Sequence, residues 1–529
     1  MKNKSGIMSG AAVLFASNLI VKITGMLYKI PLQRILTDTG TGYFSLAYNV
    51  YVWFYVITAA GIPSAVSVCI ARETSKNRPD AAGGIYRASL LFFGSVGAAA
   101  SLLTLVFCRG IASLSSLYDA YPCIAAISPC VFFSCVTSAV RGYYQGHGIM
   151  WVTAVSQLIE SVGKLSFGLL FCSFASHAAL PLSSVAAYAV FGISCGSFLS
   201  AVFCISVKSF YCRSDGAKRI EAPVLFSLLK IALPVALSSS VMNVTAASDA
   251  FIVPRLLCAS GYTEPSAAGI YGNYSTVCVS LVNLPSALVS PVCQSALPRL
   301  TSAYHNKDKE KAYGICRSML GVCLLLTLPS ASGLFVLSYQ IPALIFTEAS
   351  AAVSAPMLAA LSPCAVLIPL LSVTDTVLQS TGKPHKTLAG MSSGAVVKLL
   401  SLFIMFRFTA LDVLCIPAST CLCYLTAVVF NAVFTADLVK PDIVLGFKIA
   451  VSSVLCAVTA KAVYGSMCRI TPDRIATAAA VFSAVCSYAL ILLASGAFSD
   501  VLALDDKIII FKKKVLKNDG IRNKRKVRI

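Results

Sequence analysis

Two oppositely charged residues lie one helical turn apart in an apolar part of the chain. Glu160 and Lys164 occur in the stretch QLIESVGKL, and Glu followed by Lys at a spacing of four is the favourable order for a pair on one helix face. Because an isolated charge is costly in an apolar environment, we expect these side chains to pair. Such a pair either holds two helices together or releases its lysine to bind an anionic ligand.

A polar row near the start of the chain offers similar chemistry. It consists of Asn18, Lys22, Gly25 and Lys29. The spacings of four, three and four place these residues on one helix face. Two cations and a glycine that permits close approach suit an anionic ligand, and Arg34 follows nearby. The alternative is that the lysines extend their ammonium groups along apolar surface to a polar boundary.

Three more charged residues in apolar segments are candidates for a binding site. They are Asp249, Asp375 and Lys398. Ionisable groups in such segments usually face a partner or a water-filled cavity. Asp249 has an equally good alternative, because it could pair with Arg255 at the surface.

Enzymatic chemistry has little support in the sequence. The histidines (His147, His177, His305 and His385) lie in or beside expected connections, without the spacing of metal ligands. No Walker A motif is present, and the 21 cysteines are scattered through apolar segments like small hydrophobic residues. We therefore predict that the protein is not an enzyme and needs no metal or cofactor.

The elements that must position these residues are membrane-spanning helices. The chain has 529 residues, of which 57% are hydrophobic and 12% charged, and its mean hydropathy is +0.81. Soluble domains carry about a quarter charged residues, and a helix that crosses a bilayer needs about 20 apolar residues. We predict an all-α polytopic membrane protein. The expected spans are residues 7–28, 43–70, 88–108, 121–140, 150–172, 183–207, 225–250, 268–298, 318–338, 353–378, 388–406, 413–436, 444–465 and 476–498.

The distribution of basic residues predicts the orientation. When the connections between the fourteen expected spans alternate, most of the 42 lysines and arginines fall on the side of the two termini. The positive-inside rule then places both termini in the cytoplasm. The net charge of +21 therefore does not indicate nucleic-acid binding. The basic tail at 499–529 is expected either to lie against anionic phospholipids or to be a disordered topogenic segment.

An internal repeat predicts the domain organisation. The segment 128–165 matches 362–400 without a gap. Identical residues occur 234 positions further along for Pro129, Gln145, Gly148 and Lys164. Six expected helices separate the copies, so the two halves run parallel, as in transporters built from two six-helix halves. We predict two pseudo-symmetric lobes around a central cleft. Their bounds are 1–220 and 221–440, followed by two helices at 441–498 and the tail.

The repeat also suggests a role for its lysines. Lys164 recurs as Lys398, whereas the counterpart of Glu160 is Gly394. A lysine retained without its carboxylate indicates a function beyond pairing. We predict that Lys164 and Lys398 face the cleft from opposite lobes, and that Glu160 occupies Lys164 while the cleft is empty.

The stretch RGYYQGHGIMWVTAVSQLIESVGKL resembles a family signature. It is similar to the segment after the fourth helix in the stage V sporulation protein B group of polysaccharide-biosynthesis membrane proteins, which are related to multidrug exporters and MurJ-type lipid II flippases. The segments FASNLIVKITGMLYKIPLQRIL and LPSALVSPVCQSALPRLTSAY resemble the group's first and eighth helices. A proline common in the signature is Val152 here. The matching residues are Arg141, Gly142, Tyr143, Gln145, Gly146, Met150, Thr153, Ala154, Ser156, Gln157, Glu160 and Lys164.

The resemblance implies a flippase that works by alternating access. Its substrate would be an undecaprenyl-pyrophosphate-linked glycan, such as a peptidoglycan or spore-cortex precursor, which the protein moves from the inner to the outer leaflet. The flippase is expected to be a monomer. Sodium ions, protons or the membrane potential would drive the transport. Lys22 matches a basic cavity position of such flippases, and with Lys29 and Arg34 it is expected to attract the pyrophosphate. Their arginine in the eighth helix has no counterpart in Tyr271–Tyr274. The alternatives are a multidrug or cation antiporter and a membrane scaffold in envelope assembly.

Overall fold

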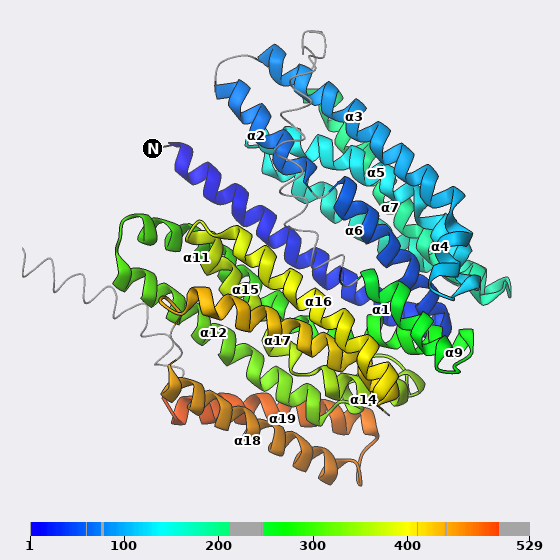
Figure 1. The fold of residues 1–529 in the computed structure, drawn as a ribbon, viewed down its shortest axis with the longest axis vertical. Helices are drawn as coiled ribbons and strands as arrows, with labels where there is room; N and C mark the ends of the chain where they lie inside the picture. The colour runs from blue at the N-terminus through cyan, green and yellow to red at the C-terminus, as the bar shows by residue number, and fades with distance from the viewer. Residues whose placement is uncertain are drawn as a thin grey trace, which may run out of the picture. The chain divides into compact units, whose positions relative to one another are not determined.

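The computed structural model describes residues 2–59, 61–75, 79–211, 245, 247–409, 411–439 and 442–496. All regular secondary structure in these ranges is helical (Figure 1). The chain forms two compact units, of which the first comprises Met1–Val277 with Ile345–Val353 and the second Cys278–Leu344 with Ser354–Ile529. The predicted lobe boundary at 220/221, most of the expected span 225–250 and the basic tail lie outside the described residues.

The first unit contains long apolar helices that pack around α5, the most buried of its candidate spans. Long apolar runs with few charged residues give these helices their length, and a proline in the first turn of α5 suits the start of a helix. The helices are α1 (Lys2–Thr58), α2 (Ile62–Ser75), α3 (Pro79–Val106), α4 (Cys108–Leu114), η1 (Tyr118–Ala120), α5 (Tyr121–Gly146), α6 (Met150–His177), α7 (Leu182–Tyr211), the helical residues 247–259 and α9 (Glu264–Gly272).

The second unit likewise consists of apolar helices that pack on one another. Aspartates begin two of its helices, because the side chains of Asp308 and Asp442 accept hydrogen bonds from the backbone N–H groups of Lys311 and Leu445. The final pair, α18 and α19, pack on each other, and α18 packs on α12 (Figure 1). The helices are α10 (Val279–Val282), α11 (Leu284–His305), α12 (Lys309–Val336), α13 (Gln340–Ile345), α14 (Glu348–Leu361, whose residues from Ser354 belong to this unit), α15 (Cys364–Ser380), α16 (Pro384–Phe408), η3 (Asp412–Leu414), α17 (Cys415–Thr435), α18 (Ile443–Met467) and α19 (Asp473–Ala494).

The described helices make this a multi-pass membrane protein. Nine of them are long and apolar enough to cross a bilayer, and the number rises to eleven if each of two bent helix pairs counts as one span. The prediction of an all-α polytopic fold is confirmed. The expected number of fourteen spans is consistent with these helices and stays a prediction, as does the cytoplasmic location of the termini.

The first helix departs from the expected spans. Residues 29–42, expected to connect two spans, are almost entirely helical, and the single break lies at Thr37 with φ 58° and ψ −174°. The expected span 43–70 is instead divided after Thr58, and α2 begins at Ile62. Gly61 lies in this second break, and Pro63 follows in the first turn of α2, where proline is tolerated. Hydrogen bonds link the polar groups around the first break: the Asp38 carboxylate accepts one from Gln33 at 2.8 Å and one from Ser350 at 2.5 Å.

The internal repeat is visible as one backbone turn that occurs twice. After α5, the N–H of Gly148 donates to the carbonyl of Gln145 and the N–H of Ile149 to that of Tyr144. After α15, the residues 234 positions further along make the same two bonds. Gly148 and Gly382 both have φ 76°, the left-handed conformation that ends a helix in a Schellman motif and favours glycine. The matched sequences thus build matched turns in the two units.

Candidate functional site

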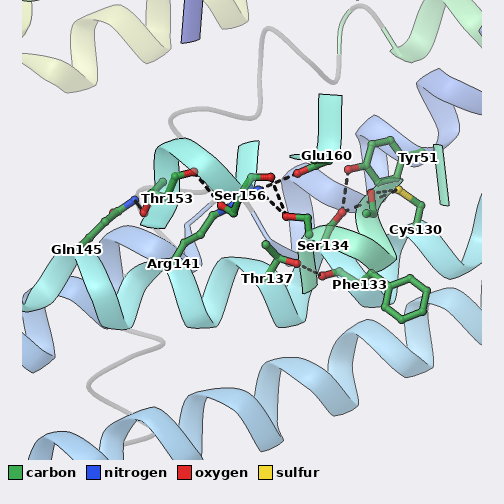
Figure 2. Close-up of polar contacts among 12 residues, drawn as sticks. Tyr51, Cys130, Phe133, Ser134, Thr137, Arg141, Gln145, Thr153, Ser156 and Glu160 are labelled. Carbon is green, nitrogen blue, oxygen red and sulfur yellow. Dashed lines mark hydrogen bonds and ion pairs between the residues drawn. The ribbon is translucent and has the colours of Figure 1, made fainter. Parts of the chain in front are cut away.

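Arg141 is the centre of a polar network between three helices of the first unit (Figure 2). From α5 it donates to Glu160 of α6 at 2.8 Å, to Ser156 of α6 at 2.8 Å and to Ser200 of α7 at 3.1 Å. The side chain of Arg141 is 11% exposed and that of Glu160 29%. Hydrogen bonds between charged partners are stronger than neutral ones, so this network fixes α5, α6 and α7 against one another.

The prediction that Glu160 pairs with Lys164 is wrong. Glu160 forms its ion pair with Arg141, while the Lys164 ammonium lies over the rings of Tyr48 at 4.3 Å and Tyr28 at 5.8 Å from their centroids. A carboxylate that is already held by a guanidinium does not neutralise the lysine one turn further along the same helix. Lys164 therefore lies on an aromatic surface supplied by α1, where cation–π attraction holds its ammonium group.

A second ammonium group lies near Lys164. The charges of Lys29 on α1 and Lys164 on α6 repel each other, and Lys29 is half-buried. Two like charges near each other favour the approach of an anion. This pair of lysines is the part of the site that is suited to a phosphate-bearing group.

Aromatic rings line the adjoining face of α1. Phe44, Tyr48, Tyr51 and Tyr55 follow at spacings of four, three and four, and consecutive ring centroids are 6.3, 6.0 and 5.8 Å apart. The hydroxyl of Tyr51 is 2.9 Å from that of Ser134 on α5 (Figure 2). The Sγ of Cys130 is 3.1 Å from the hydroxyl of Ser197 on α7. The row thereby joins the lysine pair to the interior of the unit.

Glycines allow α6 and α7 to approach closely at the level of the charged residues. A Cβ on Gly196 of α7 would lie 2.7 Å from the carbonyl oxygen of Glu160 and from the backbone nitrogen of Lys164. A Cβ on Gly163 of α6 would lie 2.9 Å from the Cα of Gly196. Small residues permit this type of backbone contact between membrane helices. The contact sets the height and rotation of Glu160 and Lys164 on α6.

The remaining predicted residues of the first unit lie apart from this network. Asn18, Lys22 and Arg34 are exposed on α1, an arrangement that fits either an anion-binding face or lysines at a membrane boundary. Asp249 is 6% exposed, and its charge acts on Tyr271, whose hydroxyl accepts a hydrogen bond from Asn49 at 2.8 Å. Substrate binding by these residues stays a prediction.

The second unit carries the repeat counterparts of the Arg141 network. Asp375 occupies the position equivalent to Arg141 and accepts a hydrogen bond from Asn431 of α17 at 2.7 Å. Gly394 replaces Glu160 because α17 takes up the space: a Cβ at Gly394 would lie 2.5 Å from the carbonyl oxygen of Cys423. Lys398 is 3% exposed and its charge acts on the Cys364 thiol. Substrate roles for Asp375 and Lys398 likewise stay predictions.

Sequence reasoning missed three contributors to the site. Arg141 was visible only as part of the family signature, although a basic residue nineteen positions before a membrane carboxylate is itself a candidate partner. Tyr28 and Tyr48 were not singled out, and the helical spacing of the aromatic residues at 44, 48, 51 and 55 was the available signal.

The fold defines a class of membrane proteins. The structure is similar to that of the lipid II flippase MurJ in an inward closed conformation, with a TM-score of 0.70 and 14% identity over 93% of this chain and 100% of that one. It is also similar to a multidrug resistance MATE family transporter in an inward-facing conformation, with a TM-score of 0.64 and 15% identity over 79% of this chain and 97% of that one. The chain thus has the fold of membrane flippases and transporters.

The sequence places the chain within a family. The model of the polysaccharide biosynthesis protein family matches residues 7–304, which is more than half of the chain, so the protein belongs to that family. The match includes α1, α5, α6 and α7, which carry the site.

Curated relatives agree with this assignment. Stage V sporulation protein B of Bacillus subtilis (strain 168) is 22% identical over 421 residues, covering 78% of this chain and 80% of the relative. The lipid II flippase MurJ of the same organism is 23% identical over 421 residues, covering 75% and 76%. The relatives and structural neighbours with a named activity are flippases or transporters, which confirms the prediction of a membrane transporter that is not an enzyme.

Proposed function

We propose that the protein is a flippase that moves an undecaprenyl-pyrophosphate-linked glycan from the inner to the outer leaflet by alternating access. The observation that supports this proposal is the state of Lys164. Its neighbour Glu160 is held by Arg141, so Lys164 has no ion pair with Glu160 and lies near Lys29, within the segment that matches the polysaccharide biosynthesis family.

The chemistry of the substrate matches this arrangement. A pyrophosphate carries several negative charges and cannot cross hydrocarbon unaided, whereas a polyprenyl tail can stay in the lipid during transfer. The protein therefore has to supply cations for the head group at membrane depth, where a charge is costly without a partner. Lys29 and Lys164 supply them, and Lys22 and Arg34, exposed on α1, extend the positive face along the same helix.

The polar network of Arg141 has a supporting role in this proposal. A lysine that attracts an anion is useful only if no nearby carboxylate competes for it. Arg141 removes that competition by binding Glu160 at 2.8 Å. The tyrosines beneath Lys164 hold its ammonium by cation–π attraction, which is weaker than an ion pair with a desolvated carboxylate, so a pyrophosphate can displace them.

The experiment is a flipping assay with the purified full chain in proteoliposomes that contain fluorescently labelled undecaprenyl-pyrophosphate-linked sugars in one leaflet. Lys164→Ala and Lys29→Ala are each expected to lower the transfer rate at least tenfold, and Lys164→Arg to retain part of it. Lys461→Ala is the matched control, because Lys461 is exposed on α18, outside the matched family segment. Its rate should equal that of the unchanged protein.

Three results would contradict the proposal. Normal transfer by Lys164→Ala would show that this lysine only anchors α6 to α1. Transport of an organic cation such as ethidium against a sodium or proton gradient, without transfer of the lipid-linked sugar, would assign the protein to the multidrug transporters of the same fold. Absence of both activities in a folded protein would support a scaffold in envelope assembly.

A further inference from the structure

A separate cavity lies at one end of the second unit. It is formed where α11, α15 and α17 end and where α12 and α16 begin, and its volume is about 1040 Å³. This is large enough for a small amphiphile or a lipid head group, since ligand pockets usually measure roughly 300–1,000 Å³. The five helix ends come from connections that the sequence predicts to be cytoplasmic.

The lining of this cavity carries charges of both signs. Lys307, Lys309 and Lys383 contribute ammonium groups, and Glu310 and Asp437 contribute carboxylates. The remaining carboxylate of the lining, Asp308, is engaged as the N-cap of α12, where it accepts from the backbone N–H of Lys311 at 3.1 Å.

These charges do not neutralise one another by direct contact. Within the part of the chain that the structure describes, no ion pair involves any of these five lysine, glutamate and aspartate side chains. Groups of opposite sign that share a cavity without pairing suit a ligand that itself carries an anion and a cation a few ångströms apart.

Apolar side chains contribute to the lining of the cavity and to the adjoining helix face. Val377 and Leu438 are among the apolar residues of the lining. Leu425, Val429 and Val433 follow one another on α17 at spacings of four and are 46%, 55% and 69% exposed. The same spacing continues to Asp437 in the cavity, so an apolar stripe along α17 leads to a carboxylate at the end of the helix.

We propose that this cavity binds the head group of phosphatidylethanolamine, whose acyl chains lie along the apolar stripe of α17. The phosphate faces Lys307, Lys309 and Lys383, and the primary ammonium faces Glu310 and Asp437. Basic pockets between membrane helices on the cytoplasmic side commonly hold lipid phosphates. The two carboxylates add selectivity for a lipid whose nitrogen carries N–H donors.

The test compares three lipids with identical acyl chains, added to the full chain in detergent and counted as bound lipid by native mass spectrometry. Phosphatidylethanolamine should be retained about fivefold more than phosphatidylcholine, whose trimethylammonium cannot donate hydrogen bonds, and more than phosphatidylglycerol, which has no cation. This ratio corresponds to about 1 kcal/mol, the net value of one typical hydrogen bond.

Variants separate the two halves of the site. Asp437→Asn should lower retention of phosphatidylethanolamine to the level of phosphatidylcholine, while Lys383→Gln should lower retention of all three lipids. Lys461→Gln on α18 is the matched control and should change none of them. All three positions are exposed, so the variants should unfold at the same temperature as the parent protein.

Defined outcomes would overturn the proposal. Equal retention of phosphatidylethanolamine and phosphatidylglycerol would show a site for phosphate alone. An unchanged lipid preference in Asp437→Asn would show that the carboxylates take no part. If glycerophosphoethanolamine, which lacks acyl chains, displaced the lipid at equal concentration, the stripe on α17 would have no role and the site would be one for a soluble phosphate ester.

Discussion

The choice of partner by Glu160 can be measured as a coupling energy. We consider Arg141→Met, Glu160→Met and the double variant. Removal of one partner from a buried ion pair costs about 3–5 kcal/mol, and the 29% exposure of the Glu160 side chain puts the expected loss near the lower limit. Each single variant should therefore lose about 3 kcal/mol of unfolding free energy.

The double variant should lose less than the sum of the single losses. Once Glu160 is apolar, Arg141 retains hydrogen bonds only to Ser156 and Ser200, and removing both members of the pair leaves no buried charge behind. We expect a coupling energy of about 2 kcal/mol, within the range of roughly 0.5–3 kcal/mol found for residues in direct contact. The matching cycle with Lys164→Met and Glu160→Met should give less than about 0.5 kcal/mol.

The assay is unfolding by sodium dodecyl sulfate in mixed micelles, followed by tryptophan fluorescence. The chain has two tryptophans, and Trp151 lies in the first turn of α6, the helix that carries Glu160 and Lys164. A larger coupling of Glu160 to Lys164 than to Arg141 would refute the arrangement, and would restore the ion pair that the sequence suggested.

Three further predictions concern the frame of the protein. Gly196→Ala should destabilise the protein by about 1–3 kcal/mol, since the added methyl group meets the backbone of α6. Gly94→Ala, whose added Cβ has nothing within 4 Å, should be neutral or slightly stabilising in the same assay. Equal losses of stability in the two variants would contradict the close contact. Thr37→Gly should raise the unfolding free energy by about 1 kcal/mol, because φ 58° with ψ −174° is a conformation that only glycine adopts without strain. A loss of stability in this variant would argue against strain at the break. The hydrogen bond from Arg317 lowers the pKa of Asp442 below its usual range, so its stabilising contribution is present above about pH 4 and is lost as the pH falls through the lowered pKa. The difference in unfolding free energy between the parent protein and Asp442→Asn should accordingly be constant from pH 8 to pH 5 and shrink below pH 4, and a difference that persists at pH 2 would contradict this origin.

Much of the local structure could be predicted from the sequence. Long apolar runs specify helices because backbone groups in a bilayer must be satisfied within the same segment, and α5, α6, α7, α18 and α19 lie close to their expected positions. The repeat is equally local in origin. Gly148 and Gly382 each permit the left-handed turn that ends a helix, so matched sequences produce matched turns.

Other features depended on tertiary structure. Helical periodicity shows that Glu160 and Lys164 share a face of α6, but it cannot show which residue of another helix faces them. The approach of α5 places Arg141 within 2.8 Å of Glu160, and α1 places Tyr48 beneath Lys164. In the second unit, the backbone of α17 fills the space beside Gly394, which leaves no room there for a carboxylate. Ion pairing over short distances depends on which helices pack together and at what rotation, and these are long-range properties that a spacing along one helix does not contain.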